Sequence, residues 1–364
     1  MKTHLLLIGN KFIYNNSLKE YIIRNIHNNI DFLDNISFFK EGDNTLFEHL
    51  DSLLNTQNNV IIVTTKQNFS TIGKVICTVT FDNQILKNNM LIPSECDLYE
   101  QGTYLLKYEK SVVNVIHVDE MQEMPKCLIY KEISHHTINI FNEQSDSLKI
   151  ILDPIAQTYD VHIDIVNIID GWTKVNITSK KYGNISQFIG STKQLLPSKI
   201  IETSNIVKYI IERLTHTNKK ITFAESCTGG LLSYYFTKEN GASNILDGSL
   251  VTYSNLIKEN WLAVDENILK ENGAVSEEVV SEMSDGAINV SSANYALSIS
   301  GIAGEGGGTQ EKPVGTVYIG VRTQDKHEEI HLSLHGDRNY IQSQSVLYAI
   351  KLLLLIDKEM FFEI

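Results

Sequence analysis

The sequence has few cysteines, and none of them falls in a paired motif. Cys77, Cys96, Cys127 and Cys227 are scattered over the 364 residues without a CxxC pair. A disulfide framework and a structural zinc site both need closely spaced cysteines, so the pattern excludes these two classes. It is typical of reduced thiols in the cytosol.

Long hydrophobic runs are also missing. The start, MKTHLLLIGNKF, holds an apolar run of four residues, which is too short for the core of a signal peptide. The most apolar later stretch, LYAIKLLLLI at 347–356, is interrupted by a lysine and falls short of the roughly 20 residues that span a bilayer. We therefore expect a soluble, cytoplasmic protein with no membrane partner.

Positive charge is in deficit. Lys and Arg number 31 against 44 Asp and Glu, giving a net charge of −13 and a pI near 5.3. Proteins that grip nucleic acid without sequence preference neutralise phosphates with Lys and Arg, so no nucleic-acid partner is expected. A content of 42% hydrophobic and 21% charged residues is that of a globular chain, and the length leaves room for two or three domains.

The first 130 residues alternate between apolar and amphipathic stretches. THLLLIG, NVIIVTT and SVVNVIHV are typical of buried strands, and SLKEYIIRNIHNNI is typical of a helix. This alternation predicts a parallel α/β sheet. Between Ser145 and about Gly190, LKIILDP, DVHIDIVNIID and WTKVNITSK indicate short strands of a small α+β module, and SQFIGSTKQLLPSKIIETS a connecting segment.

The last third is again α/β. We expect strands at KKITFA, LVTY and ALSIS, a hairpin of GTVYIGVRT and HEEIHLSL, and helices at 205–218 and LLSYYFTKEN, the latter closed by Gly241. Ser276 is expected to cap a further helix, and the last helix to begin near Asp337. The predicted domains are 1–140, 145–195 and 200–364.

A motif rich in hydroxyls, AESCTGG, follows the first strand of this last domain. A strand that turns through glycines into a helix exposes backbone N–H groups that suit a phosphate or a developing oxyanion. Gly229 and Gly230 allow a ligand close to the backbone. The alternative is structural: Ser226 or Thr228 is only a helix N-cap, and Cys227 a small core residue.

A lysine follows at the end of the next predicted strand. Lys258, in VTYSNLIK, stands 32 residues after Ser226. Because the ends of neighbouring parallel strands lie at one edge of a sheet, the two side chains could meet. A lysine with a depressed pKa can then act as the base for a serine nucleophile. The alternative is an exposed, solvated lysine.

A glycine-rich loop, GIAGEGGGT, follows the strand ALSIS. Loops of this kind inside a compact domain are usually functional, although a flexible connection would look the same. No GKS or GKT follows it, and a strand comes next, so it is neither a Walker loop nor a dinucleotide fingerprint. Arg338, at the start of the last helix, can fork onto a phosphate or carboxylate or lie on the surface.

Taken together, AESCTGG, VTYSNxxK, GAVSEEVVSEM and SISGIAGEGGGTxEKPVGTVYIG resemble the C-terminal domain of the CinA (competence-damage-inducible) family over about 200–364. The resemblance implies a nicotinamide-nucleotide amidase, which hydrolyses the carboxamide of nicotinamide mononucleotide to nicotinic acid mononucleotide and ammonia. It implies no cofactor and no metal, and a homodimer. One departure is Glu305, where the family usually has proline.

The resemblance also implies roles for individual residues. Ser226 would be the nucleophile, Lys258 its base, and Tyr253 a further residue of the catalytic group. The substrate would be bound, and its oxyanion stabilised, by the remaining positions, which are Thr228, Gly229, Gly230, Ser243, Ser300, Gly301, Gly304 and Arg338. Cys227 is the rival nucleophile, because a thiolate is intrinsically more reactive than a hydroxyl.

The front of the chain resembles the family's molybdopterin-binding-like domain in a degenerate form. Lys11 replaces an acidic residue, TKQNFST stands where the family has GGLGPT, and VDEMQEM replaces PGVPxEM. We expect its pyrophosphatase-type activity to be lost and the domain to persist as a scaffold or dimerisation element. The stretch 145–190 would match a KH-like module, but it lacks a GxxG loop and basic charge, so RNA binding is not expected.

The fold class expected is therefore α/β, with two α/β domains joined by a small α+β KH-like module. The sequence leaves a function of another class open, a non-catalytic interaction protein linked to competence or DNA damage. A pyrophosphatase acting on a nucleotide sugar through the front domain is disfavoured by the missing glycines.

Overall fold

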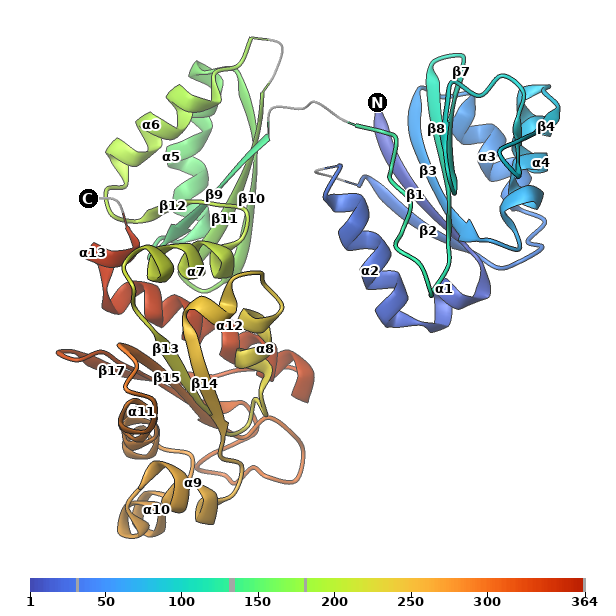
Figure 1. The fold of residues 1–364 in the computed structure, drawn as a ribbon. Coiled ribbons are helices and arrows are strands. Elements are labelled where there is room, and N and C mark those ends of the chain that lie inside the picture. Colours follow the sequence, from blue (N-terminus) through green and yellow to red (C-terminus); the bar gives the residue numbers. More distant parts are fainter. Residues whose placement is uncertain (31–32, 131–134, 180–181, 363–364) are drawn as a thin grey trace. The chain divides into compact units, whose positions relative to one another are not determined.

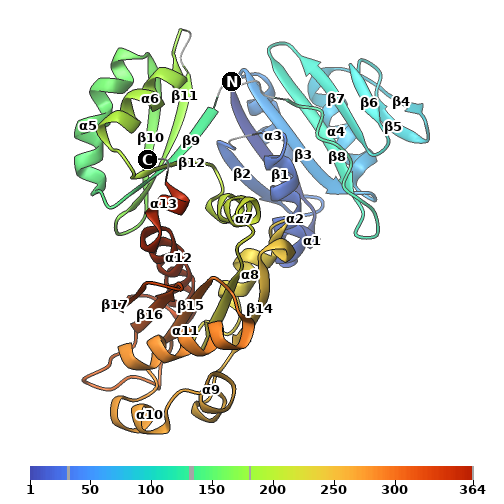
Figure 2. The same cartoon turned by 60° about the vertical axis from the view of Figure 1, so that its left-hand side comes forward.

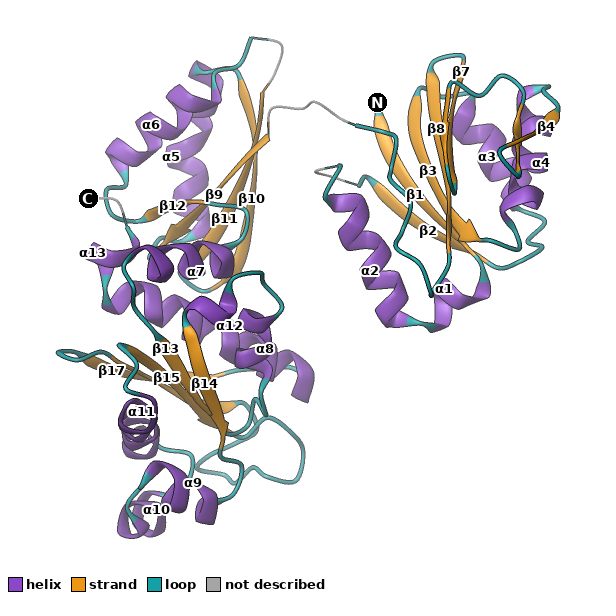
Figure 3. Ribbon diagram, in the orientation of Figure 1, coloured by secondary structure: helices purple, strands orange, loops and turns teal. Residues whose placement is uncertain are grey.

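The structure, a computed structural model, describes residues 1–30, 33–130, 135–179 and 182–362. The chain divides into two compact units, Met1–Ile133 and Ser134–Ile364 (Figure 1). Both mix helices with β-sheets, so the predicted α/β class is confirmed (Figure 3).

The first unit is built on a six-stranded sheet with the order β2-β1-β3-β8-β7-β6. The first four of these pair in parallel, and β7 and β6 are antiparallel additions. All eight residues of β3 are buried, as expected of a parallel strand covered on both faces. The strands, with the separate hairpin β4-β5, are β1 (Lys2–Ile8), β2 (Asn35–Phe39), β3 (Asn58–Thr65), β4 (Gln84–Lys87), β5 (Met90–Pro93), β6 (Leu98–Glu100), β7 (Thr103–Tyr108) and β8 (Ser111–Val118).

Two hydrophobic clusters cover the two faces of this sheet. In α2, Ile22 and Ile26 are buried one turn apart, and Asn15 caps the helix by accepting from the Leu18 N–H. The helices of the unit are α1 (Asn10–Tyr14), α2 (Asn16–His27), α3 (Leu46–Leu54) and α4 (Phe69–Thr80).

The second unit begins with a four-stranded sheet of order β10-β11-β9-β12, with two helices packed on one face (Figure 2). Its first strand starts at His135, so residues before 145 already belong to this sheet. The elements are β9 (His135–Phe141), α5 (Ser145–Thr158), β10 (Val161–Ile169), β11 (Trp172–Ser179), α6 (Ile185–Leu195) and β12 (Ile200–Glu202).

Two predictions for this module are wrong. LKIILDP lies in α5, where Leu148, Leu152 and Ala156 are buried at a spacing of four residues, which is a helical period. Pro154 removes one backbone hydrogen bond, which the helix tolerates. The supposed connecting segment contains α6, whose N-cap Asn184 accepts from the Gln187 N–H.

The rest of the unit is a five-stranded sheet of order β14-β13-β15-β16-β17. The first three strands are parallel, and β16 and β17 form the predicted antiparallel hairpin. The strands are β13 (Ile221–Glu225), β14 (Leu246–Val251), β15 (Tyr295–Gly301), β16 (Thr316–Arg322) and β17 (His327–Ser333). β14 begins earlier than the predicted LVTY strand and overlaps it only at 250–251. The polar residues of this half-exposed edge strand conceal its first part in the sequence.

Helices cover both faces of this sheet, so the predicted α/β/α arrangement is confirmed (Figure 2). One face carries α9 (Asn255–Leu262), α10 (Glu266–Asn272) and α11 (Glu277–Ser291). The other carries α7 (Ile206–His216), α8 (Leu231–Thr237), η1 (Ala242–Asn244), α12 (Arg338–Ile356) and α13 (Lys358–Phe361). Ser276 caps α11 and Asp337 caps α12, as the sequence predicts.

The part of the chain that the structure describes contains no helix long and apolar enough to cross a membrane.

Candidate active site

Ser226 lies in the turn at the carboxyl end of β13. Its backbone N–H donates to the carbonyl of Ile299 on β15 (2.9 Å), which fixes the start of the turn against the neighbouring strand. Gly229 and Gly230 then take φ values of +58° and +101°, a backbone region that other residues rarely adopt. The diglycine therefore lets the chain reverse from β13 into α8.

Lys258 comes from the first turns of α9, which Ser254 caps by accepting from the Ile257 N–H. Its side chain is 1% exposed, and its Nζ lies 3.0 Å from Ser226 Oγ and 2.8 Å from the Thr252 carbonyl oxygen. The predicted meeting of Ser226 and Lys258 is confirmed, and the alternative of an exposed, solvated lysine is wrong.

Burial sets the acidity of this amine. Removal from water disfavours the charged ammonium, and it lowers the pKa of Lys258 from 10.5 to about 8. At neutral pH an appreciable share of the amine is therefore unprotonated. A neutral amine at hydrogen-bond distance from a hydroxyl can take its proton, which is the arrangement of a general base and a nucleophile.

In Cys227, the rival nucleophile, burial shifts the pKa upward instead of downward. Burial in the hydrophobic core raises the pKa of its thiol to about 12, so it is a neutral thiol at physiological pH. Its carbonyl accepts a hydrogen bond from Gln342 Nε2 of α12 (2.7 Å). The thiolate, not the thiol, is the nucleophile, so the environment favours Ser226.

The Ser226 and Lys258 side chains open onto a cavity of about 400 Å³. Several predicted site residues line it, and these are Ser226, Tyr253, Lys258, Ser300, Gly301, Gly304 and Arg338. Glu305 is also in its wall, and Tyr253 is 63% exposed there. Ser300 Oγ donates to the carbonyl of Ala274 (2.6 Å), so this hydroxyl fastens the opposite wall.

Gly304 and Arg338 show why the loop needs a glycine at this point. A Cβ on Gly304 would lie 2.6 Å from Arg338 Nε and 2.7 Å from its Nη2. The guanidinium therefore rests against bare backbone. Arg338 lines the cavity, where its charge can meet an anionic ligand.

Four predicted binding residues lie outside the lining of the cavity. Ser243 is exposed on η1 and does not line this cavity, so its contact with substrate stays a prediction. Thr228, Gly229 and Gly230 belong to the turn, but Thr228 Oγ1 and the Gly230 N–H donate to the Glu225 carboxylate. These two donors are therefore not free to hold an oxyanion.

Glu225 is the residue that sequence reasoning missed. Its side chain is 0% exposed, and its carboxylate lies at the start of α8. The available signal was an ionisable residue ending an otherwise apolar strand directly before Ser226. A buried carboxylate needs several donors, and the N–H groups at the start of a helix supply them.

Lys312 is a second residue that was missed. Its Nζ donates to the carbonyls of Asn272 and Val275, both at 2.7 Å. The lysine comes from the far end of the glycine loop, whereas Val275 lies in the cavity wall. The loop is therefore tied to that wall and is not simply a flexible connection.

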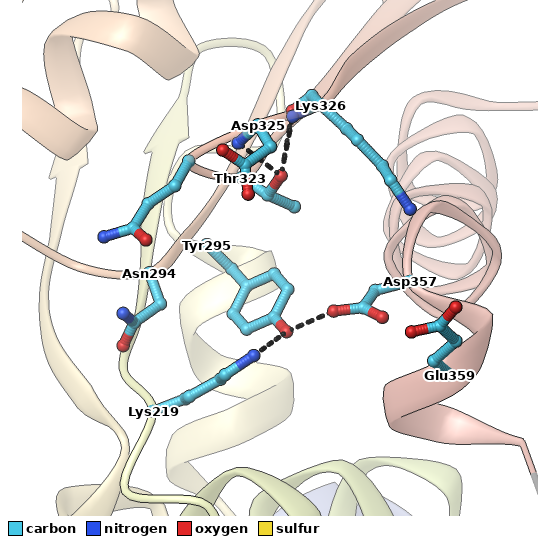
Figure 4. A pocket seen from close by; sticks show the side chains of 9 residues that line it. Lys219, Asn294, Tyr295, Thr323, Asp325, Lys326, Asp357 and Glu359 are labelled. Carbon is cyan, nitrogen blue, oxygen red and sulfur yellow. Dashed lines mark hydrogen bonds between the residues drawn. The ribbon is translucent and has the colours of Figure 1, made fainter.

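A smaller pocket lies at the opposite end of β15 (Figure 4). The hydroxyl of Tyr295 lies between Lys219 Nζ (3.2 Å) and Asp357 Oδ2 (2.7 Å), to which it donates. Burial raises the pKa of this phenol well above its usual value, so it stays protonated. The pocket contains none of the predicted site residues and lies between the start of β15, the β16–β17 turn and the start of α13.

In the first unit, two of the segments that depart from the family pattern face each other. Lys11 of α1 forms an ion pair with Glu120 of the VDEMQEM stretch (3.3 Å). A cavity of about 850 Å³ in the same unit is lined partly by Lys66, His117 and Gln122. Within the described residues, no group of three His, Cys, Asp or Glu side chains is placed to hold a metal ion.

Fold and site together define a three-layer α/β domain with a buried serine–lysine pair beneath a glycine loop. A family profile described as the CinA C-terminal domain matches residues 203–356. A CinA-like protein from Thermotoga maritima is 41% identical over 151 residues, which are 42% of this chain and 37% of that protein. The chain belongs to the CinA family.

Other relatives match longer or better-covered regions. A protein named as competence-damage inducible from Thermoanaerobacter pseudethanolicus is 30% identical over 284 residues, 75% of this chain and 64% of that one. The solved structure of a competence/damage inducible protein from Agrobacterium tumefaciens is 33% identical and covers 43% of this chain and 97% of its own, with a TM-score of 0.41. The chain thus spans 37% to 64% of the length of these curated relatives.

The protonated, buried thiol of Cys227 leads to a prediction about alkylation. We expect iodoacetamide to modify Cys96, which is partly exposed, much faster than Cys227 in the folded protein. Peptide mass spectrometry before and after denaturation measures both. Rapid modification of Cys227 in the folded state would contradict the assignment of Ser226 as the nucleophile.

Proposed function

We propose that this protein hydrolyses the carboxamide of nicotinamide mononucleotide to nicotinic acid mononucleotide and ammonia, with Ser226 as nucleophile and Lys258 as base. The observation that carries the proposal is the 3.0 Å contact between Ser226 Oγ and the buried Lys258 Nζ, whose pKa is about 8. The CinA family membership of the domain supports the same activity.

The first half of the reaction forms an acyl-enzyme. The neutral Lys258 amine takes the proton of Ser226 as Oγ bonds to the amide carbon, and the carbonyl oxygen becomes an oxyanion. The ammonium of Lys258 then gives its proton to the amide nitrogen, the C–N bond breaks, and ammonia leaves. Thr252, whose carbonyl accepts from Nζ, holds the amine on the serine throughout.

The second half releases the acid. A water molecule attacks the ester carbon while Lys258 takes one of its protons. The C–Oγ bond then breaks, and Lys258 returns the proton to Ser226. The acid product loses its own proton to solvent, so the enzyme ends as it began.

In this proposal the oxyanion donors are the N–H groups of Cys227 and Thr228, so Thr228 alone remains of the three predicted donors at 228–230. The Gly230 N–H is taken by Glu225, and the Gly229 N–H by the Ser226 carbonyl. The described residues provide no hydrogen-bond acceptor for the backbone N–H groups of Cys227 and Thr228, other than the thiol of Cys227 itself. The backbone N–H of the residue after a nucleophile is a common oxyanion donor, and in this chain that residue is Cys227.

Further parts of the proposal follow from the CinA resemblance. Arg338 would bind the substrate phosphate, and Tyr253, exposed at the cavity, would lie along the nucleotide. The first unit would be a scaffold without pyrophosphatase activity, and the protein a cytoplasmic homodimer. No step needs a metal or a cofactor.

The direct experiment is ammonia release from nicotinamide mononucleotide by the purified chain. Ser226→Ala and Lys258→Met are expected to lower kcat by at least about 10²–10⁴-fold, the usual range for losing a general base. Lys270→Met, at an exposed lysine of α10 outside the cavity lining, is the matched control and should retain wild-type activity. Wild-type protein no faster than both variants would overturn the proposal in favour of the non-catalytic alternative.

The lowered pKa of Lys258 predicts the pH dependence. The base is active only when unprotonated, so kcat/KM should rise with pH through about 8 and then level off. The profile is measured between pH 6 and pH 10 (roughly two units on either side, the span of a single titration). A rate that falls over this range would contradict the role of Lys258 as base.

The charges in the cavity wall predict substrate preference. Removing a charge-assisted hydrogen bond costs about 1.5–3 kcal/mol, so Arg338→Gln should raise KM for nicotinamide mononucleotide about ten- to hundredfold. Glu305→Gln removes a negative charge and should lower that KM. Nicotinamide riboside, which lacks the phosphate, is the control substrate. An equal effect of Arg338→Gln on both substrates would contradict phosphate binding by Arg338.

A further inference from the structure

The environment of Glu225 is unlike that of any other carboxylate near the site. It accepts hydrogen bonds from three backbone N–H groups and three hydroxyls, and all six donors follow Ser226 in the chain. These are Thr228 Oγ1 (2.8 Å), Gly230 N (3.0 Å), Leu232 N (3.0 Å), Ser233 N (2.9 Å), Ser233 Oγ (2.6 Å) and Ser249 Oγ (3.5 Å). All of these partners are hydrogen-bond donors, which matches the accepting oxygens of a carboxylate.

The two carboxylate oxygens divide the turn between them. Oε2 holds Thr228, Gly230 and Leu232, the residues that carry the chain through the reversal. Oε1 holds Ser233, in the first turn of α8, and Ser249 Oγ on β14. The hydroxyls of these two serines lie 2.6 Å apart. The side chain therefore joins the turn, the helix and the neighbouring strand from within.

Glu225 also takes part in a closed ring of contacts through its backbone. Its carbonyl accepts from the Thr252 N–H (2.8 Å), and the Thr252 carbonyl in turn accepts from Lys258 Nζ (2.8 Å). Lys258 Nζ reaches Ser226 Oγ at 3.0 Å, and Ser226 is the next residue after Glu225. The backbone of Glu225 thus holds Thr252, which in turn holds Lys258. The side chain of Glu225 holds the turn that carries Ser226.

We infer that Glu225 is the positioning residue of this site: its carboxylate holds the 226–230 turn in the conformation that keeps Ser226 Oγ on Lys258 Nζ. The inference rests on the proposed roles of Ser226 and Lys258. The N–H groups of Gly230 and Leu232 are not free for a ligand, because both donate to the Glu225 carboxylate.

Without the carboxylate, the Thr228 hydroxyl and the N–H groups of Gly230 and Leu232 lose their acceptor. Gly229 and Gly230 have more accessible backbone conformations than other residues, so the turn relaxes readily once the donors are released. A displacement of about 1 Å of a reacting group can cost about 10²-fold in rate. Loss of Glu225 should therefore slow attack by Ser226 while the binding groups at Gly304 and Arg338 remain in place.

The test measures the reactivity of Ser226 without depending on the identity of the substrate. A fluorophosphonate reagent phosphonylates an activated serine: Oγ displaces fluoride at phosphorus, and the serine proton leaves through the base. The rate of labelling at Ser226, followed by peptide mass spectrometry, is compared between wild type, Glu225→Gln and Glu225→Ala. Glu282→Gln and Glu282→Ala are the matched controls, because the Glu282 carboxylate on α11 also accepts from a backbone N–H (Asp265, 2.7 Å) but lies outside the cavity lining and the contacts of Glu225.

We expect Glu225→Ala to label about a hundredfold more slowly than wild type. Glu225→Gln, which keeps one accepting oxygen, should fall between them, and both Glu282 variants should stay near wild type. If Glu225→Ala does not fold, as judged by circular dichroism, the Glu225→Gln variant still decides the matter. With nicotinamide mononucleotide, the loss should fall on kcat, with KM changed by less than about twofold.

Two outcomes separate this inference from the proposed function. Wild-type labelling rates in folded Glu225→Gln and Glu225→Ala would overturn the positioning role, even if ammonia is released. Normal labelling of wild type without ammonia release would overturn the proposed substrate, whereas slow labelling of the Glu225 variants would still support positioning. A lower melting temperature with unchanged labelling would make Glu225 only a structural residue.

Discussion

The burial of one amine, that of Lys258, is the constraint on which the rest of the site depends. An ammonium in the interior is costly, and the cost appears as a pKa near 8 instead of 10.5. The fold meets this cost with two acceptors, the Thr252 carbonyl and Ser226 Oγ. The buried amine, which would destabilise an ordinary core, is thereby a base at hydrogen-bond distance from a hydroxyl.

The surrounding structure serves to hold that pair still. Parallel strands β13 and β14 bring the two chain segments to one edge of the sheet, and β15 anchors the Ser226 N–H. Glu225 holds the turn from within, and Lys312 ties the glycine loop to the far wall of the cavity. These contacts come from different segments of the chain, so the geometry requires the folded domain as a whole.

The sequence was sufficient to predict those features that follow from a general rule of sheet topology or from local helix chemistry. The meeting of Ser226 and Lys258 follows from the rule that neighbouring parallel strands end at one edge, and the caps Ser276 and Asp337 follow from local helix chemistry. LKIILDP misled because a proline next to an apolar run looks like the end of a strand, whereas the burial of residues four apart is decided by tertiary packing. Ser243 was placed by resemblance alone. The role of Glu225 could not be predicted, since its six donors, in the turn, α8 and β14, become neighbours only in the folded domain.

The central claim is that Lys258 is a buried amine that loses its proton near neutral pH. The most direct measurement is a titration of lysine side chains by NMR, with ¹³C at the Cε position, in wild type and in Lys258→Met. The account predicts one lysine signal with a midpoint near pH 8 that is missing from the variant. A wild-type protein in which every lysine titrates near the usual value of about 10.4 would contradict it.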